Sequence, residues 1–249
     1  MPIEIIRCLK DNYAYLVHDD ATGETTLIDA PEAAPILQRL ADKGWTLTRV
    51  FITHHHWDHV DGLAAILEAA PAEVWGAATD AHRLPPLDHR FQPDDILPGG
   101  AQVLDAPGHT LGHVAFYYPA EKALFSADSL MTHGCGRLFE GTADQMFETI
   151  ARMAALPGDT RLFSGHDYAR ANLAFAARFA DPQAHAARMA DLPGLADRGE
   201  PTTGTTLESE RLLNPYMRCH LPEVAAAAGL PGGDARTVLA EIRRQKDNA

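Results

Sequence analysis

The sequence is short of cysteine pairs and of long apolar runs. Its 249 residues include three cysteines, and their spacing fits neither a zinc finger nor a CxxC motif. This odd number suits free thiols in a reducing compartment. No apolar run reaches the ~18 residues of a membrane span, and no basic segment leads into an apolar one near residue 1. We therefore expect no signal peptide, no membrane span and a cytoplasmic location.

Positive charge is also scarce. The chain has 21 Lys and Arg against 34 Asp and Glu, a formal net charge of -13. This balance argues against nucleic acid and anionic membranes as partners. A small anionic substrate would need a local cationic patch. Hydrophobic residues make up 46% of the chain, which is typical of a soluble globular protein built as one large domain, or one domain with an appendage.

The first two-thirds of the chain predicts an α/β domain. Short apolar segments bounded by Gly, Pro or Asp are typical of buried strands. We predict strands at Ile3–Arg7, Tyr13–His18, Thr25–Asp29, Thr48–Thr53, Glu73–Gly76, Gln102–Ala106, Val114–Tyr118, Ala123–Ser126 and Arg161–Ser164. Helices are predicted at Asp61–Ala70 and after a possible capping box at Thr142–Gln145.

After Tyr168 the strand pattern ends and helical periodicity takes over. Asp181-Pro182 and Asp234 are candidate helix starts, and Thr205–Glu208 resembles a capping box. The Gly, Pro and Thr content of Leu192–Gly204 predicts a loop. We predict an α/β domain over residues 1–168 and a smaller helical domain over residues 169–249.

Histidine is abundant, with 13 residues, and it is clustered. The segment Thr53–His59 reads THHHWDH and directly follows a predicted strand. Alternate strand residues share a face, so His54 and His56 can turn the same way, with Asp58 and His59 beside them. Imidazoles and carboxylates suit zinc, iron or manganese. The alternative is a surface histidine tract, which would not carry an embedded Trp-Asp after a buried strand.

Three more ligand-type residues follow predicted strands, each next to Gly or another small residue. They are His109, Asp128 and His166. Each alone would suit a turn or a satisfied polar group, but the repeated placement favours metal binding. Together with the histidine cluster, they would complete two adjacent metal sites.

These residues resemble the signature of the metallo-β-lactamase superfamily, with its HxHxDH motif and later ligands in the same order. The resemblance implies a four-layer αβ/βα sandwich. It also implies that His54, His56 and His109 hold one metal, that Asp58, His59 and His166 hold the other, and that Asp128 bridges them. Asp58 and Asp128 are the candidate catalytic residues. The chain departs from the pattern at Ser126-Ala127-Asp128, where the superfamily more often has Thr-Gly-Asp.

Two metals roughly 3.5 Å apart can share a hydroxide formed from water whose pKa falls to about 7. They can also polarise a carbonyl and hold the oxyanion that forms. A thioester suits such a site, because its thiol, with a pKa of about 8.5, leaves without strong help from a general acid. His55, His113 and His133 are expected to be supporting or structural residues.

The segment Gly134–Thr142 is similar to the part of the glyoxalase II family that contacts glutathione. Arg137 stands where that family often has Lys, and Phe139 stands where it often has Tyr. Tyr168 matches a further aromatic residue that touches the tripeptide. The alternative for the two aromatic residues is ordinary core packing.

The C-terminus is also similar to the helical domain of glyoxalase II. Arg243 and Lys246 are three residues apart on a predicted helix and so share a face. The resemblance assigns them to the glycine carboxylate of glutathione, which would provide the cationic patch. The alternative is a solvated helix end, where basic residues favour the helix dipole.

The resemblance implies hydrolysis of S-D-lactoylglutathione and related 2-hydroxyacylglutathiones to glutathione and D-lactate, a step of methylglyoxal detoxification. The expected cofactors are two divalent ions, zinc first, with iron or manganese as substitutes. The expected partner is a small glutathione thioester, with no nucleic acid or membrane, and a monomer is the simplest assembly. The main alternative is a glutathione persulfide dioxygenase with a single iron. A non-catalytic metal-binding protein on the same scaffold is a second alternative.

Overall fold

The computed structural model describes residues 1–249, apart from the side chain at position 196. The chain folds into two compact units. Unit 1 comprises Met1–Asp105 and Gly112–Glu121, and unit 2 comprises Ala106–Leu111 and Lys122–Ala249. These units divide the chain differently from the domain boundary after residue 168, which stays a prediction.

Unit 1 is built on a mixed sheet with the strand order β1-β2-β3-β4-β5-β6. The first three strands pair antiparallel, and the later neighbours pair parallel. Strands β7 and β8 of this unit also pair antiparallel with each other. The strand bounds are β1 Ile3–Cys8, β2 Asn12–His18, β3 Glu24–Ile28, β4 Thr46–Phe51, β5 Glu73–Ala77, β6 His89–Phe91, β7 Gln102–Asp105 and β8 Val114–Tyr118.

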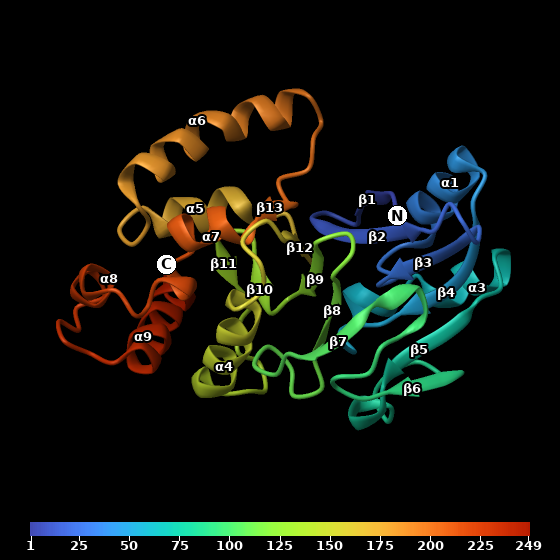
Figure 1. Ribbon diagram of the computed structural model, residues 1–249, viewed down its shortest axis with the longest axis horizontal. Coiled ribbons are helices and arrows are strands. Elements are labelled where there is room, and N and C mark those ends of the chain that lie inside the picture. The colour runs from blue at the N-terminus through green and yellow to red at the C-terminus, as the bar shows by residue number, and fades with distance from the viewer. The chain divides into compact units, whose positions relative to one another are not determined.

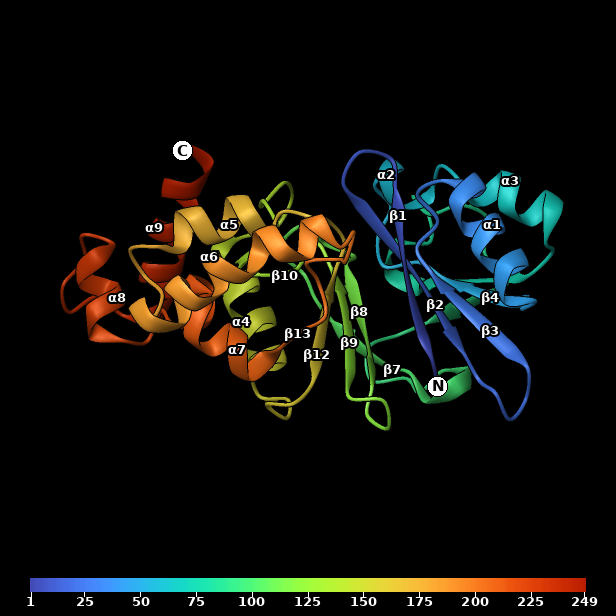
Figure 2. The ribbon, with the colours of Figure 1, turned by 90° about the horizontal axis from the view of Figure 1, so that it is seen from above.

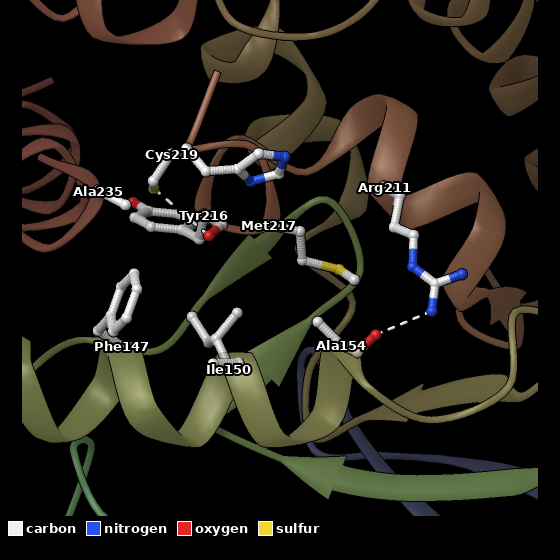
Figure 3. A pocket seen from close by; sticks show the side chains of 10 residues that line it. Phe147, Ile150, Ala154, Arg211, Tyr216, Met217, Cys219 and Ala235 are labelled. Atoms are coloured by element: carbon white, nitrogen blue, oxygen red, sulfur yellow. Dashed lines mark hydrogen bonds between the residues drawn. The ribbon is translucent and has the colours of Figure 1, made fainter. Parts of the chain in front are cut away.

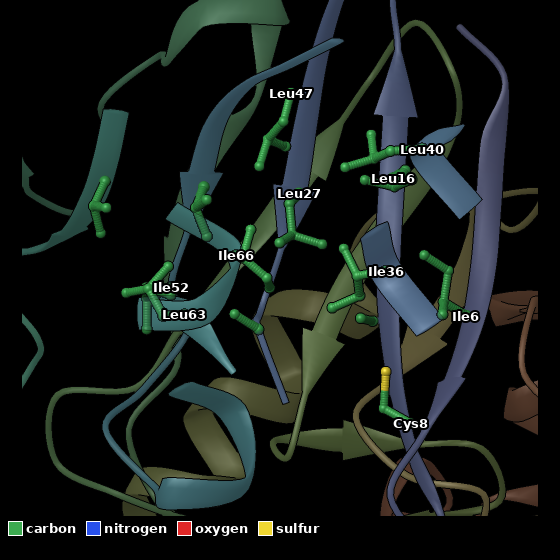
Figure 4. Close-up of a cluster of buried hydrophobic side chains, with 14 residues drawn as sticks. Ile6, Cys8, Leu16, Leu27, Ile36, Leu40, Leu47, Ile52, Leu63 and Ile66 are labelled. Carbon is green, nitrogen blue, oxygen red and sulfur yellow. The ribbon is translucent and has the colours of Figure 1, made fainter. Parts of the chain in front are cut away.

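Helices α1 and α3 pack on one face of this sheet (Figure 1). The helices of unit 1 are α1 Ala33–Lys43, α2 Trp57–Val60 and α3 Leu63–Ala69, with a 3-10 turn η1 at Ala78–Asp80 and another, η2, at Pro98–Gly100. Ile36 of α1 and Ile66 of α3 meet Leu16 and Leu27 of the sheet in one apolar cluster (Figure 4). Alternate strand residues reach this face, because strand side chains point to opposite sides in turn.

Unit 2 contains a smaller ladder in which β12 pairs parallel with β9 and antiparallel with β13. Strands β10 and β11 form a short hairpin. The strand bounds are β9 Ala123–Ala127, β10 Leu130–Met131, β11 Gly134–Cys135, β12 Arg161–Ser164 and β13 Thr205–Thr206.

Two helices of unit 2 begin at caps that were predicted from the sequence. The predicted capping box is present, because Thr142 accepts from the backbone of Gln145 and Gln145 bonds back to Thr142. Asp234 caps the last helix as predicted. The helix bounds are α4 Ala143–Ala154, α5 Ala169–Ala176, α6 Pro182–Asp197, α7 Leu207–Leu213, η3 Pro215–Met217, α8 Pro222–Ala227 and α9 Ala235–Asp247.

Helices α5, α6 and α7 form a small apolar cluster of their own, and Figure 2 shows α6 lying across α5. Leu192 of α6 is 3% exposed in this cluster, beside Leu173 and Leu213. The prediction of a loop over Leu192–Gly204 is therefore wrong in its first half, where α6 continues through Pro193 to Asp197. Burial of Leu192 outweighs the local preference of Pro and Gly for a turn.

Two further predictions need correction. The capping box predicted to start at Thr205 lies one residue too early. The cap of α7 is Thr206, whose side chain accepts from Ser209 N, while Thr205 donates to Glu210. A short strand also occurs after Tyr168, since β13 pairs with β12. The predicted strands of the first two-thirds agree with the structure to within two residues at each end.

An apolar cavity of about 260 Å³ lies in unit 2 between α4 and η3 (Figure 3). Phe147 and Ile150 of α4 face Tyr216 and Met217 across it. Arg211 closes one side and donates to the Ala154 carbonyl. Across the residues that the structure describes, no helix combines the length and apolar character needed to cross a membrane.

Candidate metal centre

Four predicted ligands of unit 1 lie together on the segment that follows β4 and enters α2. His54 Nε2 lies 3.2 Å from His56 Nδ1, and His59 Nε2 lies 3.9 Å from Asp58 Oδ2. His54 and His59 are 1% and 0% exposed, so their rings are withdrawn from bulk water. The segment follows a parallel strand, and this strand end turns alternate side chains toward one another.

The carboxylate of Asp29 orients two of these imidazoles. Its Oδ2 atom accepts from Nδ1 of His59 at 2.8 Å and from the Thr53 hydroxyl at 2.8 Å. Because the Thr53 proton is used in that bond, Thr53 Oγ1 accepts from Nδ1 of His54 at 3.0 Å. Each ring therefore carries its proton on Nδ1 and presents Nε2 as a lone-pair donor. This is the arrangement in which histidine binds a metal.

Asp29 was not among the predicted site residues, although a signal for it exists in the sequence. Asp29 is the last residue of the predicted strand Thr25–Asp29, and the other predicted ligands likewise lie at or just after the end of a predicted strand. Its backbone has φ 58°, and it is 3% exposed. Asn12 is a second missed residue, and its side chain donates to Asp58 Oδ2 at 3.0 Å.

Three predicted ligands of unit 2 meet at one carboxylate oxygen. Asp128 Oδ2 lies 3.4 Å from His109 Nε2 and 3.2 Å from His166 Nε2. All three residues are buried. His109 donates from Nδ1 to the Arg137 carbonyl at 2.8 Å, so its Nε2 carries the lone pair that can bind a metal. One carboxylate oxygen therefore lies between two imidazole nitrogens.

The loop around Asp128 depends on close backbone approach. A Cβ at Gly136 would lie 1.9 Å from the Asp128 carbonyl oxygen, so this position accepts only glycine. Ala127 has φ 42°, the left-handed region that favours glycine. The chain thus keeps the left-handed turn at the position where it departs from the superfamily pattern.

All seven predicted ligands belong to His and Asp groups that could hold a metal ion. Mixed imidazole and carboxylate donors suit zinc, iron or manganese, and the orienting partners of His54, His59 and His109 fit the same use. The other histidines have different surroundings. His55 pairs with Asp80 at 3.1 Å, and His113 stacks on His54 with ring centres 4.7 Å apart.

The predicted glutathione contacts Arg137, Phe139 and Tyr168 lie beside the ligands of unit 2. Phe139 meets the His109 ring edge-on at 5.2 Å, and Tyr168 stacks on His166 at 4.8 Å. Phe139 is 62% exposed and Tyr168 is 39% exposed, so neither aromatic ring belongs to the core. The core-packing interpretation of these two residues is therefore wrong.

Arg243 and Lys246 differ in their surroundings. Arg243 is only 5% exposed, and its Nη1 donates to the Cys135 carbonyl at 2.9 Å. Lys246 donates to the Ala171 carbonyl at 3.1 Å. Burial lowers the pKa of Lys246, and the positive charges of Arg243 and Arg137 lower it further. The charges of Arg137 and Arg243 therefore act on Lys246. We call Arg137, Arg243 and Lys246 the cationic cluster.

Family profiles match the whole length of the chain apart from its first nine residues. Residues 10–166 match the family described as Metallo-beta-lactamase superfamily, and residues 167–249 match the one described as Hydroxyacylglutathione hydrolase C-terminus. A protein of Ruegeria pomeroyi named Hydroxyacylglutathione hydrolase is 50% identical over 254 residues, with 100% of both chains covered.

Solved structures agree on the fold. The crystal structure of ETHE1 from Myxococcus xanthus has a TM-score of 0.70 and 26% identity, and the match covers 98% of this chain and 90% of that one. The structure of TTHA1623 in a di-iron-bound form has a TM-score of 0.63 and 27% identity, covering 87% of this chain and 100% of that one. These matches support the predicted α/β metallo-β-lactamase fold.

Proposed function

Since the chain belongs to the metallo-β-lactamase superfamily, and within it to the hydroxyacylglutathione hydrolases, we propose that it hydrolyses the thioester of S-D-lactoylglutathione. The products are D-lactate and glutathione. In this reaction the oxygen of water adds to the thioester carbonyl carbon, the carbon–sulfur bond breaks, and the thiolate departs and takes up a proton. Related 2-hydroxyacyl groups are expected to react in the same way.

The observation that carries the proposal is the set of oriented ligands in each unit. His54 and His59 are held by Thr53 and Asp29, and His109 is held by the Arg137 carbonyl. Such partners fix the ring and raise its basicity as a ligand.

We assign the ligands as the family resemblance does. His54, His56 and His109 hold one ion, Asp58, His59 and His166 hold the second, and Asp128 bridges the two. Two divalent ions, with zinc as the first expectation and iron or manganese as substitutes, would lower the pKa of bound water to about 7 and polarise the thioester carbonyl. A structure with two irons in a 27% identical protein supports the count of two ions.

The chain's own residues bind and orient the tripeptide. Phe139 and Tyr168 offer apolar faces next to His109 and His166. The cationic cluster attracts the glycine carboxylate of glutathione. It provides the local positive charge that an anionic substrate needs on a protein with a net negative charge. Because these contacts hold the substrate at a distance from the thioester carbon, we expect them to act mainly on KM. The helical C-terminal domain over residues 169–249 and the cytoplasmic location remain predictions.

Two measurements distinguish the proposed hydrolase from a persulfide dioxygenase: the substrate that reacts and the number of metal ions per chain. We expect the purified protein to hydrolyse S-D-lactoylglutathione and to consume no oxygen with glutathione persulfide. Oxygen uptake with one iron per chain would replace the proposal with the alternative. Metal retention with neither reaction would favour the non-catalytic scaffold. The match of residues 167–249 to a hydrolase C-terminus supports the hydrolase.

A further inference from the structure

Two arginines of unit 2 share one carboxylate of their own chain. Oδ1 of Asp247 lies 2.7 Å from Nη2 of Arg243 and 3.7 Å from Nε of Arg137. Both arginines are proposed here to meet glutathione. A side-chain carboxylate therefore stands at the cations that a substrate carboxylate needs.

Arg243 is also held by contacts that do not involve Asp247. Its Nη1 is bonded to the Cys135 carbonyl, its guanidinium carbon lies 5.8 Å from the centre of the Tyr216 ring, and its side chain is buried. Arg137 is held even less by Asp247. Its side chain is 64% exposed, and an exposed ion pair at 3.7 Å contributes little. Loss of the Asp247 charge would thus leave both arginines available.

Asp247 pairs with Arg243 four residues earlier on α9, but its negative charge lies at the unfavourable end of the helix dipole. It is the last residue of α9. Its side chain is 39% exposed, so it can turn outward into water. The cationic cluster stays net positive with Asp247 present, and therefore still attracts an anion.

We propose that Asp247 is an intramolecular competitor for the terminal carboxylate of glutathione. In the free protein its carboxylate occupies Arg243 Nη2, and the glycine carboxylate displaces it on binding. The exchange reverses when product glutathione leaves, so Asp247 weakens product retention. The inference rests on the proposed function and adds a residue that sets affinity within it.

The test compares Asp247→Asn with Glu241→Gln. The second variant makes the same charge change on α9, where Glu241 pairs with Arg244 at 2.7 Å. We would measure the Kd of glutathione by calorimetry and the KM of S-D-lactoylglutathione. Analogues of glutathione and of S-D-lactoylglutathione in which the glycine carboxylate is replaced by a carboxamide serve as control ligands without that charge.

We expect Asp247→Asn to lower the Kd and KM of the carboxylate ligands by roughly five-fold, as the loss of one competing ion pair would. Glu241→Gln should change neither, and the carboxamide ligands should show no gain. An unchanged or weaker affinity in Asp247→Asn would overturn the inference, as would an equal gain for the carboxamides. If neither the wild type nor either variant hydrolyses the thioester, the proposed function fails. The Kd of glutathione still decides the role of Asp247 in that case. Failure of every variant to bind glutathione overturns both.

Discussion

Oδ2 of Asp29 accepts a hydrogen bond from Nδ1 of His59 at 2.8 Å, with both side chains buried. Through Thr53, the same carboxylate also supports His54. In the proposed assignment, these two imidazoles bind different ions. One carboxylate outside the ligand set therefore orients a ligand of each ion.

Replacement of Asp29 by Asn should weaken the binding of both metal ions. The amide keeps the size of the side chain but lacks the charge that raises the basicity of the imidazoles, so we expect a loss of roughly 10- to 100-fold in metal affinity. Competition with a chromophoric chelator would measure it. Asp80→Asn, which removes the carboxylate partner of His55, is the control. Equal metal affinity in wild type and Asp29→Asn would refute the orienting role.

Asp128→Ala should lower metal content and thioester hydrolysis in parallel. Its Oδ2 atom lies between His109 and His166, so its removal takes away the ligand proposed to be shared by both ions. Elemental analysis and turnover would be measured on one sample. Asp159→Ala, at an exposed carboxylate paired with Lys122, is the control. Normal metal stoichiometry in Asp128→Ala would exclude bridging.

Ala127→Gly should not destabilise the protein, although Ala127 is 4% exposed. Relief of a left-handed residue is worth about 1–2 kcal/mol, whereas the added chain entropy of glycine costs about 0.5–1 kcal/mol. We expect the free energy of unfolding to stay equal or rise by up to about 1 kcal/mol. Urea denaturation would measure it. A loss above about 1 kcal/mol would mean that packing of the Ala127 methyl group outweighs the strain.

Phe139→Tyr should strengthen substrate binding. The ring is exposed beside His109, and the added hydroxyl can donate to the tripeptide as the usual Tyr of the family would. A hydrogen bond of about 1 kcal/mol corresponds to a KM lower by roughly five-fold, with kcat unchanged. Steady-state kinetics would check this. A KM equal to that of the wild type would show that the hydroxyl finds no partner in this chain.

The affinity for the glycine carboxylate should fall at alkaline pH through Lys246. Burial and the neighbouring charges of Arg243 and Arg137 lower its pKa, so it loses its proton below the pH at which a free lysine does. As pH rises through this lowered pKa, the positive charge disappears and the Kd for S-methylglutathione increases. Lys246→Arg keeps its charge and should show a flatter profile. Identical profiles for the two proteins would remove Lys246 from the carboxylate site.

The strands of the first two-thirds and the fold class were predictable from the sequence, because each rests on a local pattern. The assignment of the metal ligands stays a prediction. His109 and Asp128 follow apolar strands, a signal visible without coordinates. The surroundings of Arg243 were not predictable in this way. Its burial depends on a carbonyl 108 residues away, at Cys135, and its neutralising partner Asp247 looks like an ordinary helix-end residue in the sequence.

Errors arose where local preference and packing disagreed. The Pro and Gly residues after Leu192 favour a turn, but burial of Leu192 extends α6. The capping box predicted to start at Thr205 was also wrong by one residue, because Thr205 bonds Glu210 and Thr206 caps the helix. Such choices depend on contacts between distant segments, which no local pattern contains.

The most direct test of the account measures S-D-lactoylglutathione hydrolysis and metal content in one sample, before and after chelation. We predict about two divalent ions per chain, turnover that disappears with their removal, and recovery when zinc, iron or manganese is returned. A protein that carries both ions and leaves this thioester intact would contradict the account.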